Sequence, residues 1–125
     1  MKIISAQEHH AAVSPTALSL ANDLDPRALD LTGVTRIDLV FPKFTDGRAY
    51  SQAFLLRRRL GFAGELRATG DVLIDQLVQM QRTGFDVAVL KEGVDASAAQ
   101  RQFERFAGFY QGSAVEASPQ FAKAT

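Results

Sequence analysis

The sequence predicts a small α/β domain built on a mainly parallel β-sheet of repeated βα units. From Val34 onward, segments with strand periodicity alternate with segments of helical periodicity, and glycines separate them. The pattern occurs three times and follows an N-terminal region that has strand-like segments of its own. Because one face of the predicted strands is charged, a half-barrel-like sheet is one arrangement that fits.

The N-terminal third contains two predicted strands, Lys2–Ser5 and Ala17–Ala21. Asp25-Pro26 predicts a helix start, since proline is favoured at the first helical position. We expect a single domain over residues 1–125, with weakly structured ends at 1–15 and 111–125.

Two signals predict the three βα units: the spacing of apolar residues, and the glycines, prolines and aspartates that mark the ends of strands and helices. Ile37, Leu39 and Phe41 alternate along one strand, whereas Ala49, Ala53, Leu56 and Leu60 share one helical face before Gly61. The strands that we expect here are 35–41, 65–69 and 85–90, and the helices are 48–60, one from Gly70-Asp71 to about Thr83, and a last helix capped by Asp95.

One strand face is unusually polar for a parallel sheet. Parallel strands are normally covered on both faces and are continuously apolar, yet here one face carries Arg36, Asp38, Glu65, Arg67 and Asp86. This face is solvated, or meets another subunit, or lines a polar cavity. A homo-oligomer is favoured over a monomer, because a short parallel sheet also has edges to cover.

Composition excludes several classes of function. The 14 basic and 14 acidic residues cancel, so nucleic acid is not an expected partner. Without cysteine there is no disulfide, thiolate nucleophile or cysteine-ligated iron–sulfur cluster. The sequence shows no signal-peptide pattern and no membrane span, which predicts a cytoplasmic protein without a membrane partner. No cofactor and no metal site are predicted, and His9 and His10 are expected to be surface residues.

The loop after the first of these strands is the richest in candidate binding groups. In open α/β sheets, ligands bind beyond the carboxyl ends of the strands. This loop has a lysine, a hydroxyl, a carboxylate and a guanidinium at a helix start, which suits a small oxyanion or a phosphate. Its anion-binding candidates are Lys43, Thr45, Gly47 and Arg48, with Asp46 as a catalytic candidate. The alternative is that Thr45 or Asp46 only caps the helix and the cations are solvated.

Two further acids and one arginine are candidates. In the predicted helix, Asp71 and Asp75 are one turn apart and face the same way, as in general acid/base catalysis or a metal site. The alternative is helix capping, which the helix dipole favours. Arg67 could neutralise Asp38 or Asp86, or could bind an anion.

Three segments resemble one bacterial family, domain-of-unknown-function family 934, which is described as probably involved in sulfite reduction. The segments are FPKFTDGRAYS (41–51), GFAGELRATGDVLIDQL (61–77) and GFDVAVL (84–90), and the resemblance covers roughly Leu20 to Tyr110. It adds to the candidate surface the residues Phe44, Tyr50, Ser51, Gly70 and Gln76.

The resemblance implies an accessory protein of assimilatory sulfite reduction, which would support electron delivery to sulfite reductase or its assembly. Its expected partner is sulfite reductase or the electron donor of that enzyme. Two alternatives remain open: a small enzyme that binds an oxyanion or a phosphorylated metabolite at the carboxyl ends of the strands, and a structural subunit of an oligomer.

Overall fold

The computed structural model describes residues 1–43 and 47–114, with residues 106–114 described by their backbone alone. Its elements, in chain order, are β1 (Lys2–Ser5), α1 (Ala6–Ala11), β2 (Ala17–Leu20), the 3-10 helix η1 (Pro26–Ala28), β3 (Arg36–Phe41), α2 (Arg48–Phe54), the π-helix η2 (Leu55–Arg59), β4 (Glu65–Gly70), the 3-10 helix η3 (Ile74–Gln76), α3 (Leu77–Thr83), β5 (Val87–Leu90) and α4 (Ala96–Ala114).

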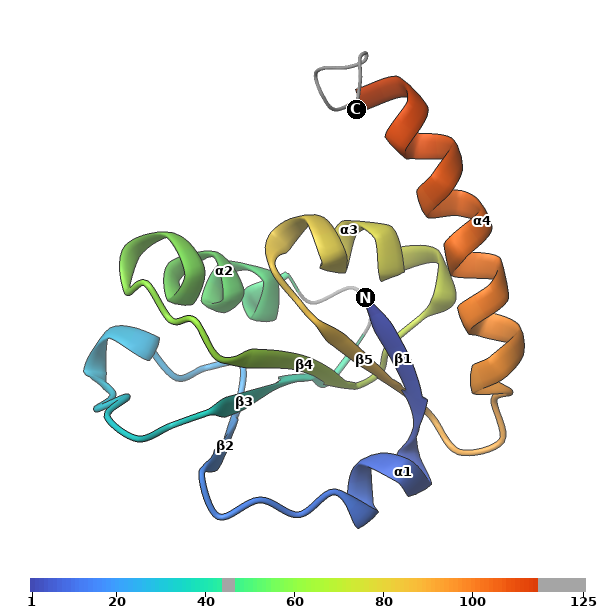
Figure 1. Ribbon diagram of the computed structural model, residues 1–125. Helices are drawn as coiled ribbons and strands as arrows, with labels where there is room; N and C mark the ends of the chain where they lie inside the picture. The colour runs from blue at the N-terminus through green and yellow to red at the C-terminus, as the bar shows by residue number, and fades with distance from the viewer. Residues whose placement is uncertain (44–46, 115–125) are drawn as a thin grey trace.

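The five strands form one parallel sheet in the order β1-β5-β4-β3-β2. From β2 to β5, each strand lies beside its predecessor and the steps run in one direction, so right-handed connections place their helices on one face. The step from β1 to β2 runs the opposite way across the sheet, which places α1 on the other face. Figure 1 shows α2 and α3 on one side of the sheet and α1 on the other. The predicted parallel α/β fold is confirmed.

The main core lies between the sheet and α2, α3 and α4. The alternating residues Ile37, Leu39 and Phe41 of β3 are fully buried there. The start of α4 packs against β1, where the side-chain oxygen of Gln100 accepts a hydrogen bond from the Ile3 backbone N–H at 2.8 Å. A smaller apolar cluster on the α1 side consists of Ile4, Val87 and Val89. Both faces of β1 and β5 are therefore covered.

The helix expected over 48–60 changes type midway. It is α-helical to Phe54 and continues as a π-helix, in which the Leu60 N–H donates to Leu55 O at 2.9 Å. The wider turn rotates the residues that follow it. Leu60, predicted to face the core, is 39% exposed, and Phe62 packs into the core instead.

The two chain ends also differ from expectation. Residues 1–15 contain β1 and α1, and Ser5 and Glu8 form a reciprocal capping box at the start of α1. At the other end, α4 continues to Ala114. Asp95 caps this helix as predicted and accepts hydrogen bonds from the N–H groups of Ser97 and Ala98. The rest of the expected C-terminal tail lies outside the described residues.

Candidate functional site

The carboxyl ends of β3 and β4 are held together by a close backbone contact. The Asp71 N–H donates to Phe41 O at 2.7 Å, and Gly70 beside it has a φ of +90°. A Cβ on Gly70 would lie 2.4 Å from Phe41 O, so only glycine fits. Gly70, a candidate surface residue by resemblance, thus has a structural role: it lets the chain turn away above β3.

This turn places Asp71 at the ends of the strands, where it forms an ion pair. Lys91 directly follows β5, and its ammonium group contacts Asp71 Oδ1. The ion pair links the loops after β4 and β5 and leaves the Asp71 carboxylate one-fifth exposed. Lys91 was not predicted as a site residue, although its position directly after a buried strand was the available signal.

The predicted pairing of Asp71 with Asp75 on one helical face is wrong. The helix expected from Gly70-Asp71 begins only at Leu77, after an irregular turn and η3. Asp75 is exposed in η3, whereas Asp71 lies in the turn before it. Gln76 ends η3 and directly precedes α3. The two acids therefore do not share one face of a helix, which was the basis for pairing them.

A cavity of 280 Å³ lies where β2 and β3 end, between the chain that follows β2 and the first turns of α2. Gln52 lines it and is almost fully buried. The Gln52 amide nitrogen donates to Ala21 O and Leu24 O, each at 2.8 Å, which fixes the orientation of the carboxamide. Among the described residues, no group donates a hydrogen bond to its carbonyl oxygen. A buried acceptor without a partner is costly, and a ligand that donates a hydrogen bond would satisfy it.

Two polar residues of α2 that the sequence singled out, Arg48 and Ser51, line the same cavity. Lys43 and Gly47 are exposed on either side of the intervening loop. Sequence reasoning missed Gln52, because this polar residue lies directly before Ala53 of the apolar helix face and nothing in the sequence marks it as buried. The candidate residues Phe44, Thr45 and Asp46 lie outside the described residues.

Tyr50 belongs to the core more than to the surface. Its ring packs edge-on against Phe41, with ring centroids 5.1 Å apart, and also contacts Phe85. The phenolic oxygen is buried, with no hydrogen-bond partner in the part of the chain that the structure describes, and burial raises the pKa of Tyr50. Tyr50 was a candidate surface residue through the family resemblance, but its contacts indicate a packing role.

The charged face of the sheet is covered by α1 and is largely shielded from solvent. Arg36 donates to both carboxylate oxygens of Asp38, at 3.0 and 3.2 Å. On the next strand, Arg67 pairs with Glu65 and donates to His9 Nδ1 at 2.9 Å. We call these five residues, His9, Arg36, Asp38, Glu65 and Arg67, the charge network. The face is therefore not a solvated surface.

His9 links the two halves of the charge network. An arginine can only donate, so His9 Nδ1 accepts and a neutral ring carries its proton on Nε2, which faces Asp38 Oδ2 at 3.5 Å. Burial lowers the pKa of His9, Asp38 partly offsets this, and the cations Arg67 and Arg36 lower it further. The prediction of a surface residue is wrong for His9, whose side chain is 15% exposed.

Arg67 does not pair directly with either acid expected for it, since its ion pair is with Glu65. Asp86 also differs from expectation, because it precedes β5 and does not share the charged face. The register aligns Val87 with Arg67, so the residue before Val87 lies at the amino-terminal edge of the sheet. There the Asp86 carboxylate accepts from the Leu66 N–H at 2.9 Å and pairs with Arg57 at 2.6 Å.

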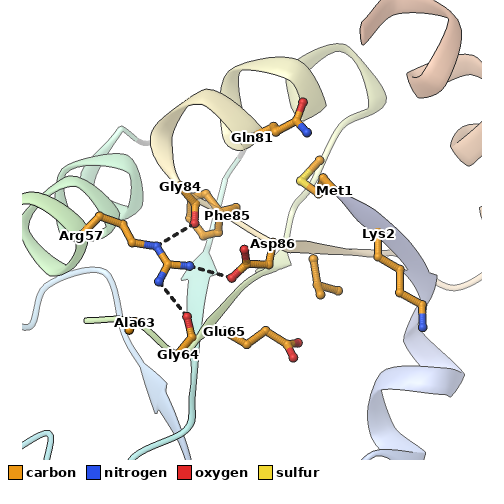
Figure 2. Close-up of a pocket in the computed structure, with 11 residues that line it drawn as sticks. Met1, Lys2, Arg57, Ala63, Gly64, Glu65, Gln81, Gly84, Phe85 and Asp86 are labelled. Atoms are coloured by element: carbon orange, nitrogen blue, oxygen red, sulfur yellow. Dashed lines mark hydrogen bonds and ion pairs between the residues drawn. The ribbon is translucent and has the colours of Figure 1, made fainter. Parts of the chain in front are cut away.

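Arg57 closes this amino-terminal edge (Figure 2). Its guanidinium donates to the carbonyls of Gly84 (3.0 Å), Phe62 (2.8 Å) and Gly64 (2.7 Å), in addition to its ion pair with Asp86. A cavity of 820 Å³ lies beside it, which Met1 and Gln81 line from above in this view. These contacts tie η2 to the segments that directly precede β4 and β5.

The fold and the site define a parallel α/β protein with a cavity at the carboxyl ends of the neighbouring strands β2 and β3. The chain belongs to the family described as "Bacterial protein of unknown function (DUF934)", whose model matches residues 17–121. No curated protein and no solved structure matches the chain. Across residues 1–43 and 47–114, no helix is long and apolar enough to span a membrane, and no group of three metal-binding side chains occurs.

Proposed function

We propose that this protein is a cytoplasmic accessory component of assimilatory sulfite reduction, which docks onto sulfite reductase or its electron donor. The support for this role is what the resemblance of three sequence segments implies about sulfite reduction, since the description of the matching family states no function. The observation that carries the proposal is how the residues of those segments are used. Gly70, Asp71 and Asp86 all make contacts that hold the shape of the chain. Residues that hold the backbone in a fixed shape fit a protein that docks onto a partner better than they fit a catalyst.

The first experiment is growth of a deletion strain on sulfate, sulfite or sulfide as the sole sulfur source. Loss of growth on sulfate and sulfite, with rescue by sulfide and by the intact gene, is the expected result. Growth on all three sources would refute the role. A tagged full chain should also retain sulfite reductase or its electron donor during purification, whereas an Arg57→Met variant, which loosens the fold, should retain less.

A second candidate function is oxyanion binding at the carboxyl ends of β2 and β3. The 280 Å³ cavity favours it, because Arg48 and Ser51 both line the cavity. A guanidinium binds an oxyanion through two parallel hydrogen bonds, and a serine hydroxyl adds another donor. If the ligand is phosphorylated and reactive, the same groups would orient it for a small enzyme.

Thermal unfolding with sulfite, sulfate or phosphate tests this second candidate. A real ligand at a hundredfold excess over its Kd stabilises the fold by about 2.7 kcal/mol. Arg48→Met should abolish that stabilisation, and the matched control Arg58→Met, on an exposed part of η2, should keep it. No change in melting temperature with any of the three anions would refute oxyanion binding.

Homo-oligomerisation is a separate proposal, supported by the edge of the sheet. Within residues 1–43 and 47–114, β2 is an edge strand that pairs with β3, so one side of its backbone is available to another strand or to a covering segment. Ser19 is exposed on β2. Sedimentation of the full chain should show a dimer or a larger species, and Ser19→Pro, which blocks strand pairing, should give a monomer. A monomeric wild-type protein would refute the proposal.

A further inference from the structure

Another cavity, of 200 Å³ and with charged residues in its lining, lies on the α1 side of the sheet, beside the charge network. Its base is a row of three residues in register on neighbouring strands: Lys2 on β1, Val87 on β5 and Arg67 on β4. Neighbouring strands are about 4.8 Å apart, so the two cations start about 10 Å from each other, on either side of Val87. Glu8 and Ala12, one helical turn apart, line the α1 side.

Arg67 and Lys2 have N–H donors that are available to a ligand. The Arg67 guanidinium uses Nε for Glu65 and Nη1 for His9. Within the part of the chain that the structure describes, no group accepts a hydrogen bond from Arg67 Nη2, and the Lys2 ammonium makes no ion pair. A carboxylate placed above Val87 would lie between two cationic donors, and charge-assisted hydrogen bonds of this kind are the strong ones.

Two acids line the same cavity. Glu65 gives one carboxylate oxygen to Arg67, and Glu8 gives one to the Ser5 N–H in the capping box. Each carboxylate has a second oxygen that can accept from an ammonium group. The charges around the cavity are thus two positive and two negative, which complement a ligand that carries both signs better than a simple anion.

We propose that this cavity binds a small zwitterion, an α-amino acid, with its carboxylate on Arg67 and Lys2 and its ammonium on Glu8 and Glu65. The volume corresponds to about seven water molecules, which suits a molecule of a few heavy atoms. Ile4 and Val87 provide an apolar floor for a short side chain. The site is separate from the cavity at the ends of β2 and β3, and its ligand does not depend on the proposed role in sulfite reduction.

Calorimetric titration of the full chain with glycine and with L-serine tests the proposal. N-acetylglycine lacks the ammonium group and glycinamide lacks the carboxylate, so each probe removes one half of the zwitterion. We expect both amino acids to bind and each half-probe to bind at least about tenfold more weakly, since one charged hydrogen bond contributes that much. No binding of either amino acid, or equal binding of N-acetylglycine, would overturn the proposal.

Variants locate the site. Glu8→Gln removes one charge but keeps the capping box, because glutamine serves there as well as glutamate. Glu8→Gln and Lys2→Gln should each weaken glycine binding about tenfold, with an unchanged melting temperature of the unliganded protein. The matched control is Glu92→Gln, an exposed change in the loop after β5. An equal loss of affinity in the control, or full affinity in both cavity variants, would show that glycine binds elsewhere.

Discussion

Replacing Arg57 by methionine should destabilise the fold strongly, whereas the same change at its two neighbours should not. Arg57, Arg58 and Arg59 are consecutive, so the three variants remove the same charge from the same segment. Only Arg57 is directed inward, with a side chain that is 19% exposed. Its guanidinium satisfies three backbone carbonyls of other segments and one carboxylate oxygen.

The expected loss follows from those four hydrogen bonds. Each contributes on the order of 1 kcal/mol to stability, and the carbonyls would lose a partner that no methionine can replace. Asp86 is half exposed, so its ion pair is screened by water and contributes least. We expect Arg57→Met to lower the free energy of unfolding by about 3 kcal/mol, which is about 10 °C in melting temperature for a domain of this length.

Urea and thermal unfolding of the three variants measure this difference. Arg58 lies over the Phe54 ring at 5.4 Å and is exposed, so Arg58→Met and Arg59→Met should each change stability by no more than about 0.5 kcal/mol. Arg57→Lys retains the charge but loses the planar fork, and should fall between Arg57→Met and the wild type. If Arg57→Met is within about 1 kcal/mol of the two controls, the contacts at the amino-terminal edge do not stabilise the fold as argued.

Three further predictions concern pH, backbone and capping. The folded state lowers the pKa of His9, so the free energy of unfolding should decrease as the pH falls below about 6.5, by up to about 1.4 kcal/mol per pH unit. Urea unfolding of His9→Gln should lack this pH dependence. Identical pH profiles for the variant and the wild type would contradict the prediction. Gly70→Ala places a Cβ against Phe41 O and should lower the free energy of unfolding by at least about 2 kcal/mol. Gly33→Ala, where φ is also positive but the space is open, should lower it by about 1 kcal/mol. Equal losses of stability in thermal melts would exclude the clash. Asp95→Ala should cost about 1 kcal/mol of stability by loss of the α4 cap, and an unchanged denaturant midpoint would show that the cap is dispensable.

The elements that the sequence predicted well are those governed by short-range patterns. Alternation of Ile37, Leu39 and Phe41 defined β3, and Asp25-Pro26 and Asp95 marked helix starts that the structure has. These signals depend on residues a few positions apart, since side-chain direction and capping are local properties. The candidate loop after β3 was found in the same way, from its place at a strand end.

The errors arise where distant segments meet. The helix expected at Asp71 is delayed, because the close contact of Gly70 with Phe41 fixes the chain in a turn first. The π-helix at Leu55–Arg59 turns Leu60 outward, although Leu60 fits the α-helical stripe. His9 was expected on the surface because nothing near it in the sequence indicates burial.

The sequence by itself determined the βα repeat, the polar strand face and the strand-end loops that contain the candidate binding residues, because periodicity and end signals are local. The tertiary structure alone decided which charges meet. The β1 to β2 connection crosses the sheet in the direction opposite to the others, so it brings α1 over the polar face and His9 between Asp38 and Arg67. That placement depends on strand order, which brings His9 to Arg67 across 58 positions of the sequence, and no local pattern contains it.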